Sequence, residues 1–370
     1  MALFKKSTRP TRDGDDHAVT ETAPCEKSLR LVMSPQEVAP VRAAVLAEFQ
    51  KEAALPGFRK GKAPVELVRR QYADAIQQEL VQRLSRRALE QAAKAHQLKP
   101  VGPFEVKQVQ LNDADGLTLE ATVEVEPTFA LGAYTGLPLT EPSLEVAAEE
   151  LQRALASLQD SMAQLVPAGE GQPKERKVPP LDEAFAKDLG FDTVAKLTEH
   201  VEAKLREQKR AAQARDVETA LCDELLARHA FAVPAKLVAR QTEQLTRDFR
   251  VRLLLSGITE GQVEEELKKF TEQLRTSAAR HVKLAFILDR IAEAEQIGVA
   301  EQDLVERLWR LSQRWKKDPA DVRKIFDAQG LWGSVASAIR QEKTIELLKR
   351  EAKITQSLNH PITQSPVQQP

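Results

Sequence analysis

The sequence predicts a multidomain, mostly α-helical protein, with an N-terminal α+β domain followed by an extended all-helical C-terminal domain that carries arm-like helices. Its 370 residues correspond to two or three domains, at roughly 150 residues for each. Only 5% of the residues are aromatic, so leucine, valine, alanine and isoleucine have to build the cores, which favours helices over β-barrels. Strict alternation of apolar and polar residues at 117–125 marks the α+β part.

The α+β domain is expected at residues 28–127, after a disordered extension at 1–27. Ser34-Pro35 is typical of a helix start, because serine caps the first turn and proline fits the first helical position. Asp115-Gly116 is typical of a tight turn between two strands. The expected elements are a strand at 29–33, helices at 35–49 and 64–96, and a β-hairpin with strands at 104–111 and 117–125.

Residues 128–180 are expected to form an extended connector, a helix and a linker, and no further domain. The helix begins near Val146, and its apolar residues recur alternately four and three positions apart. This heptad pattern is typical of a helix that packs against a partner helix, and it consists of Leu151, Leu155, Leu158, Met162 and Leu165. The residues that follow, 167–180, are rich in proline and charge and are expected to be a linker.

Residues 181–355 are expected to form a helical domain, followed by a disordered tail at 356–370 that is rich in proline, glutamine and serine. Asp192 is expected to cap the first long helix of this domain, which runs to about His229. Its middle part lacks an apolar face, which predicts a helix that stands partly away from the body of the domain, as an arm. Further helices are expected from Pro234 onwards.

Charge and composition exclude several classes of protein. Lys and Arg number 54 against 55 Asp and Glu, so the net charge of -1 excludes an overall polycation. No apolar run approaches the roughly 18 residues that a membrane span needs, and two cysteines far apart in sequence favour a reducing, cytoplasmic location. The six histidines are scattered, and neither a P-loop nor a dinucleotide-binding motif occurs. The sequence therefore predicts no catalytic residue, no cofactor and no metal site.

The most unusual segment is the loop expected between the first helices, at 55–64. Two glycines bracket an aromatic and two cationic residues, and a third cation follows: Gly57, Phe58, Arg59, Lys60, Gly61, Lys62. This arrangement suits a partner that offers phosphates or carboxylates around an apolar notch, because arginine makes bidentate contacts and phenylalanine can be buried. The alternative is a solvated basic turn whose phenylalanine folds back onto its own domain.

The charge is distributed unevenly along the chain near this loop. Residues 57–100 contain ten Lys and Arg against four Asp and Glu, a net of +6. Residues 101–165 contain two basic and eleven acidic residues, a net of -9. The basic segment can therefore face a polyanion such as RNA, which repels the acidic segment beside it.

The motif Gly57-Phe58-Arg59-Lys60-Gly61-Lys62-Ala63-Pro64 resembles the ribosome-docking signature of the bacterial trigger factor family, and the resemblance extends over residues 28–355. It implies a cytoplasmic, ribosome-associated chaperone that assists nascent polypeptides at the exit tunnel without ATP. It also implies that Phe58, Arg59 and Lys60, supplemented by Lys62, contact a protein and the rRNA of the large ribosomal subunit. A homodimer off the ribosome is a further expectation. Pro56 is a departure, because family members often carry an acidic residue there.

A second departure concerns the middle of the chain. Family members typically insert a prolyl-isomerase domain of the FKBP type, which needs on the order of 100 residues, whereas only 167–180 are available here. The sequence therefore predicts a chaperone without enzymatic activity. Two alternatives stay open: a peptidyl-prolyl isomerase with an unrecognised site, and a ribosome-independent helical adaptor or assembly chaperone. Some apolar residues either line a cradle for clients or belong to ordinary core: 253–255, Phe270, Leu274 and 322–332.

Overall fold

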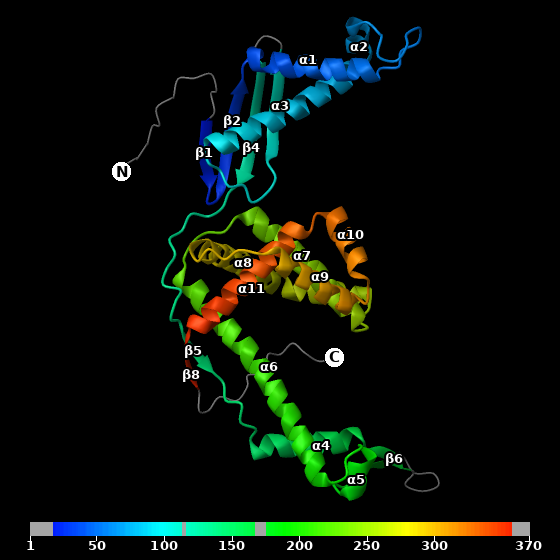
Figure 1. The fold of residues 1–370 in the computed structure, drawn as a ribbon, viewed down its shortest axis with the longest axis vertical. Helices are drawn as coiled ribbons and strands as arrows, with labels where there is room; N and C mark the ends of the chain where they lie inside the picture. Colours follow the sequence, from blue (N-terminus) through cyan, green and yellow to red (C-terminus); the bar gives the residue numbers. More distant parts are fainter. Residues whose placement is uncertain (1–17, 113–115, 167–174, 357–370) are drawn as a thin grey trace. The chain divides into compact units, whose positions relative to one another are not determined.

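The computed structural model describes residues 18–112, 116–166 and 175–356 (Figure 1). The chain divides into two compact units, each built from two segments: Met1–Ala130 with Ala230–Phe286, and Leu131–His229 with Ile287–Pro370. Each unit contains its own clusters of buried apolar side chains. The domain boundaries expected from the sequence stay a prediction.

A four-stranded antiparallel sheet lies in the first unit. Its strands are β1 (Ala18–Ala23), β2 (Glu26–Met33), β3 (Glu105–Asn112) and β4 (Gly116–Glu124), in the order β1-β2-β4-β3. β3 and β4 pair with each other as the predicted hairpin, and Leu111 lies opposite Leu117. In the central pair of strands, Leu31 lies opposite Leu119, and both side chains are buried.

Three helices accompany this sheet: α1 (Pro35–Glu52), α2 (Val65–Gln71) and α3 (Ala73–Ala95). The backbone N–H of Ser34 donates to the Glu37 carboxylate at 2.8 Å, which satisfies a free donor at the start of α1. Figure 1 shows α3 crossing the strands, and α1 packs against both α3 and β4. The shared core includes Val45, Leu84, Ala88, Leu117 and Leu119.

The structure corrects the expectation of disorder up to residue 27. Residues 18–23 form β1, which pairs with β2, and Val19 packs against the main core. The β-branched residues of this segment favour extended backbone, and pairing satisfies polar backbone groups along the edge of β2. The rest of the expected extension, residues 1–17, lies outside the described residues.

The start of a further helix is held by the end of the sheet. This helix is α7 (Ala235–Leu255). It is followed by α8 (Glu260–Ala294), and the first unit ends within α8, at Phe286. The Glu124 carboxylate accepts hydrogen bonds from the backbone N–H groups of Lys236 at 2.6 Å and Leu237 at 2.9 Å. Glu124 is only 5% exposed, although alternation places it on the polar face of β4. Its burial is tolerated because free N–H donors and the positive end of the helix dipole surround it.

The second unit consists, in its described part, of helices and short strand pairs. Its helices are α4 (Ala148–Ser161), α5 (Glu183–Asp188), α6 (Val194–Arg228), α9 (Glu301–Trp315), α10 (Pro319–Gln329) and α11 (Trp332–Glu351). β5 (Pro138–Glu141) pairs in parallel with β8 (Lys353–Gln356), and β6 (Gln164–Val166) pairs antiparallel with β7 (Glu175–Lys177). Gln356 therefore belongs to β8, and the tail at 357–370 lies outside the described residues.

The heptad helix has a partner but ends earlier than expected. α4 ends at Ser161, and Leu165 lies in β6, because residues 164–166 satisfy their backbone groups by pairing with β7. Upstream, Leu158 packs against a cluster of Phe185, Ala186 and Leu197 from α5 and α6. The linker expected at 167–180 is correspondingly shorter, since 175–177 form β7, and residues 167–174 lie outside the described residues.

α6 begins one residue later than expected. The side chain of Thr193, and not that of Asp192, accepts a hydrogen bond from the N–H of Lys196 at 3.3 Å. As its composition predicts, none of the side chains between residues 198 and 216 is buried. Polar contacts support this stretch: the Lys209 ammonium lies 2.6 Å from the Glu150 carboxylate.

Lys236 adds charged contacts at the start of α7. Its ammonium lies 2.6 Å from a Glu105 oxygen and 3.1 Å from a Glu26 oxygen. The hydrogen bond to Glu105 raises the pKa of Lys236 above its ordinary value of 10.5, and the hydrogen bond from Lys236 lowers the pKa of Glu26 below 4.5. The contribution of Glu26 to stability is complete above pH 4.5 and is lost as the pH falls through its lowered pKa. The contribution of Lys236 is complete below pH 10.5 and is lost as the pH rises through its raised pKa.

We therefore expect Lys236→Met to lower the free energy of unfolding by a constant amount between pH 4.5 and 10.5. Below pH 4.5 the difference from wild type should shrink, because the protonated Glu26 carboxyl group no longer attracts the ammonium. Urea unfolding followed by circular dichroism across this pH range measures the difference. Lys60→Met, at an exposed lysine of the loop, is the control and should show no such dependence. A difference that grows below pH 4.5 would contradict the assignment.

Candidate functional site

The predicted loop joins α1 to α2 through two successive tight turns. In the first turn the N–H of Phe58 donates to the carbonyl oxygen of Leu55 at 3.1 Å, and Gly57 has a positive φ of 87°. A positive φ at the third position, with proline at the second, is the pattern of a type II turn. Pro56 occupies that second position, where its ring presets the required φ. The departure from the trigger factor pattern at Pro56 thus favours the turn.

The second turn follows the same plan. The N–H of Lys62 donates to the carbonyl oxygen of Arg59 at 2.9 Å, and Gly61 has a φ of 78°. A Cβ at Gly61 would lie 3.3 Å from the carbonyl oxygen of Lys51 at the end of α1. Glycine is therefore needed here both for the backbone angle and for the close approach to α1.

A small cluster of buried side chains closes the base of the loop. One residue lies just before the loop, one near its end and one in α2; this loop-base cluster consists of Ala53, Ala63 and Val68. Phe49 and Tyr72 pack against both the loop-base cluster and the main core, and their ring centroids are 6.2 Å apart. The Gln50 side-chain amide donates to the carbonyl oxygen of Ala63 at 2.9 Å. The two ends of the loop are thus held by the folded domain while its tip projects.

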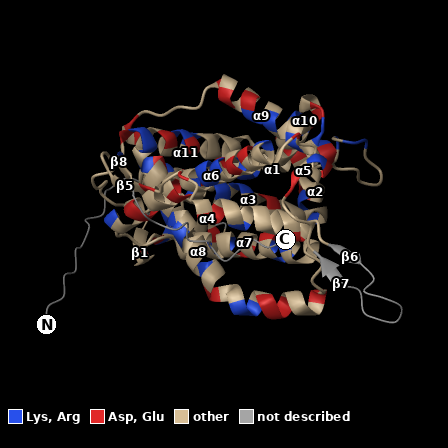
Figure 2. Cartoon of the chain, turned by 90° about the horizontal axis from the view of Figure 1, so that it is seen from below, with Lys and Arg blue, Asp and Glu red and all other residues tan. Residues whose placement is uncertain are grey.

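The side chains at the tip are exposed to solvent. Phe58 is 42% exposed, and Arg59, Lys60 and Lys62 are exposed as well. Residues 53–64 include no acidic side chain, and Figure 2 shows Lys and Arg in blue along the loop beside α2. The alternative in which Phe58 folds back onto its own domain does not match this exposure, because a phenylalanine packed on a core is largely buried.

For two apolar segments the sequence allowed either a client-binding surface or ordinary core, and the exposure of their side chains distinguishes these alternatives. At the end of α7, Leu254 and Leu255 are exposed, and Leu255 reaches 83%. In α10, by contrast, Val322 and Phe326 are buried, and the ring of Phe326 packs edge-on against Trp332. The 253–255 segment thus presents apolar surface, whereas the buried residues of 322–332 are core.

One exposed apolar surface was missed by the sequence reasoning. On α9, Val305 and Trp309 are exposed, and Trp309 reaches 58%. They lie one helical turn apart, next to the half-buried Leu304 and Leu308. The available signal was the width of the apolar stripe on this helix, which is greater than one packed face requires.

In the described part of the chain, no group of three or more His, Cys, Asp or Glu side chains is arranged to hold a metal ion. No helix in that part has both the length and the apolar composition needed to cross a bilayer. The described residues present a projecting cationic loop with an exposed aromatic residue, and helices that expose leucine, valine and tryptophan side chains.

Exposed apolar side chains on helices, together with a cationic loop on an α+β unit, are surfaces that suit interaction with other macromolecules, and the family models assign such a chain to the class of molecular chaperones. A model described as "Bacterial trigger factor protein (TF)" matches residues 16–158, and one described as "Bacterial trigger factor protein (TF) C-terminus" matches residues 193–350. Together these matches span most of the chain, and the chain belongs to the bacterial trigger factor family. Only residues 159–192 lie between them, and the middle prolyl-isomerase region of the family is lacking.

Individual relatives match along almost their whole length. The trigger factor of Solibacter usitatus (strain Ellin6076) is 24% identical over 413 residues, covering 90% of this chain and 98% of the relative. The trigger factor of Anaeromyxobacter sp. (strain Fw109-5) is 24% identical over 424 residues, covering 91% and 98%. Because both alignments are longer than the 370 residues of this chain, the relatives carry residues without a counterpart here.

One solved structure shows the same fold. It is described as "Promiscuous Substrate Recognition in Folding and Assembly Activities of the Trigger Factor Chaperone", and it superposes with a TM-score of 0.51 at 18% sequence identity. The match covers 90% of this chain and 99% of that one. The N-terminal α+β region and the long helical part of this chain therefore have the trigger factor fold.

Truncation of the loop-base cluster should loosen the loop without unfolding the domain. We expect Val68→Ala to cost about 2 kcal/mol locally, from two lost methyl groups and the cavity that they leave. Amide hydrogen exchange at Phe58 and Lys62, whose N–H groups close the two turns, should accelerate. Leu67→Ala is the matched control, because Leu67 precedes Val68 but is exposed. Equal exchange in both variants would show that the cluster does not hold the loop.

Proposed function

We propose that the protein is a ribosome-associated chaperone that docks through the 57–62 loop on the large ribosomal subunit beside the exit tunnel. The observation that carries the proposal is an exposed Phe58 held between glycine turns and followed by three exposed cations. Arg59, Lys60 and Lys62 pair with rRNA phosphates or with acidic side chains of a ribosomal protein. Phe58 becomes buried in an apolar notch of that protein and supplies the main anchor.

Nascent polypeptides are held by the helical part of the chain, in the cytoplasm. Exposed leucine, valine and tryptophan side chains on α7 and α9 offer apolar contacts to segments that have not yet folded. Binding and release need no ATP, a proposal supported by the absence of a P-loop from the sequence. We also propose that the protein forms a homodimer off the ribosome.

The protein works without prolyl-isomerase activity. The proposal rests on the length of the stretch between the two family segments, which comprises residues 159–192. An isomerase domain requires on the order of 100 residues, so this stretch is too short to contain one. Within that stretch, both strands of the β6–β7 pair and α5 account for part of the residues. The function of the chain is therefore sheltering and release of clients.

The docking proposal predicts the behaviour of the variant Phe58→Ala/Arg59→Ala/Lys60→Ala. Its affinity for purified bacterial ribosomes should fall by about a hundredfold or more, because one buried aromatic anchor and two charged contacts are lost. Co-sedimentation with ribosomes at physiological salt measures this loss. Its thermal stability should match that of wild type, since all three side chains are exposed.

The matched control is Arg30→Ala/Val106→Ala/Lys107→Ala, which removes one exposed apolar and two exposed cationic side chains from the sheet of the same unit. It should sediment with ribosomes as wild type does. Equal sedimentation of the loop variant and wild type would overturn docking through the loop. A wild-type protein that stays in the supernatant, yet prevents aggregation of denatured clients, would favour the ribosome-independent chaperone.

The absence of isomerase activity is tested by refolding of a model protein whose folding is limited by proline isomerisation. We expect catalytic amounts of the protein to leave the refolding rate unchanged, because the isomerase region is lacking. A purified FKBP-type isomerase serves as the positive control for the assay. Acceleration that scales with the concentration of the protein would favour the alternative of an unrecognised catalytic site.

A further inference from the structure

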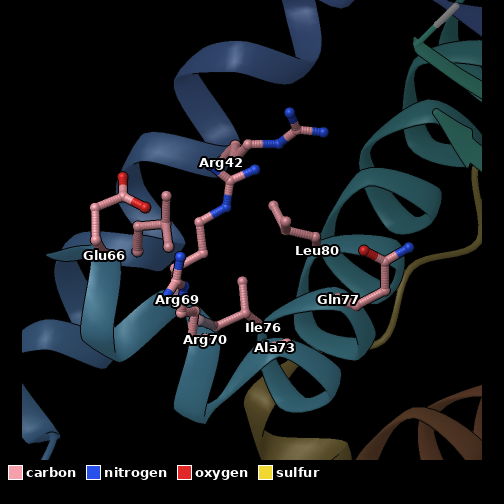
Figure 3. Close-up of a pocket in the computed structure, with 9 residues that line it drawn as sticks. Arg42, Glu66, Arg69, Arg70, Ala73, Ile76, Gln77 and Leu80 are labelled. Carbon is pink, nitrogen blue, oxygen red and sulfur yellow. The ribbon is translucent and has the colours of Figure 1, made fainter. Parts of the chain in front are cut away.

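A second basic feature lies beside the loop, in a hollow of about 530 Å³ that α1, α2 and α3 enclose (Figure 3). Three arginines line this arginine hollow: Arg42 from α1, and Arg69 and Arg70 from the end of α2. Its apolar floor is formed by the side chains of Ile76 and Leu80 from α3, which are buried. Sequence reasoning did not single out this group, because Arg42 is far in sequence from the other two.

The charge of the arginine hollow is positive. Glu66 is the one acidic residue among the nine that line it, against three guanidinium groups. The N-terminus of α3 adds to the positive potential, because Ala73 is both its first residue and part of the lining. Each guanidinium carries five N–H donors, so an arginine with an intramolecular partner still has donors for a ligand.

We propose that the arginine hollow binds the phosphodiester backbone of RNA, as a second contact in the ribosome docking described above; the inference rests on that proposed function. Three planar forks around one space match a run of phosphates, because each fork makes two parallel hydrogen bonds to one phosphate. Carboxylates of an acidic protein segment would pair with the same forks, and a polyglutamate arm of the test distinguishes that ligand from RNA. The volume is that of a small-molecule site, so a ribose or base fits over the apolar floor.

The loop and the arginine hollow belong to one piece of structure. α2 begins at Val65, three residues after Lys62, and its Val68 is buried in the loop-base cluster. Arg69 and Arg70 follow Val68 directly, and therefore leave the helix in other directions and remain exposed. A ribosomal surface that engages the loop thus meets the arginines of α2 within one or two helical turns.

The test compares full-length wild type with Arg42→Gln/Arg69→Gln/Arg70→Gln, which removes three charges and keeps polar side chains. Binding to purified bacterial ribosomes and to polyuridylate RNA is measured over a range of salt concentrations. We expect the affinity of the variant for both to fall by about tenfold or more at physiological salt. The slope of log affinity against log salt should become shallower by roughly two, at about 0.7 for each lost phosphate contact.

The matched control is Arg30→Gln/Arg86→Gln/Arg87→Gln, which removes the same charge from exposed arginines outside the hollow. Its slope of log affinity against log salt should differ from that of wild type by less than about 0.7, the contribution of one phosphate contact. The loop variant Phe58→Ala separates the two proposals, because it should weaken binding to ribosomes and leave binding to polyuridylate unchanged. Thermal unfolding of all variants shows whether the fold is kept.

Three results would overturn the inference. The first is an arginine-hollow variant that binds ribosomes and polyuridylate with the affinity and salt slope of wild type, even if Phe58→Ala no longer binds ribosomes. The second is equal loss of RNA affinity in the hollow variant and its control. The third is binding of wild type to polyglutamate but not to polyuridylate, which would assign the arginine hollow to an acidic protein segment. Failure of wild type to bind ribosomes would sink the proposed function, while binding of polyuridylate through the three arginines would still support an RNA site.

Discussion

The packing of the short helix α2 against the end of α1 is the constraint on which the basic surface of the first unit depends. Val68 is buried in the loop-base cluster, and Phe49 with Tyr72 connects that cluster to the main core. This packing sets the distance between the ends of the loop, so that two glycine turns suffice to span it. It also sets the position of the arginines that follow Val68 on α2. One small apolar contact thus places all of these cations.

The arginines of this unit divide into two kinds by what surrounds them. Arg83 on α3 makes hydrogen bonds to Glu48 on α1 and to Glu79 one turn before it, so its charge joins two helices. Arg59 and Arg70 are exposed to solvent, and residues 53–64 around Arg59 include no acidic side chain. The first kind stabilises the fold, and the second kind raises the local potential towards a polyanion. A net charge of -1 for the whole chain conceals this division.

The second unit shows how a trigger factor chain closes without the middle region of its family. α4 packs through Leu158 against Phe185 and Leu197, so the helix before the missing region and those after it share one cluster. β6 and β7 pair across the remaining gap. The apolar contacts between α4 and α6 therefore form without an inserted domain, because Leu158 precedes the position of the missing region and its partners follow that position.

The sequence by itself determined the class of fold, the β3–β4 hairpin and the composition of the loop, because turn chemistry and apolar periodicity act over a few residues. The family resemblance was carried by the same local signals. Only the tertiary structure decided that residues 18–23 pair as β1, that α4 stops at Ser161, that Glu124 is buried and that Arg42 joins Arg69 and Arg70. Each of these features depends on a partner segment elsewhere in the chain, and a pattern of a few neighbouring residues does not specify which segment that partner is.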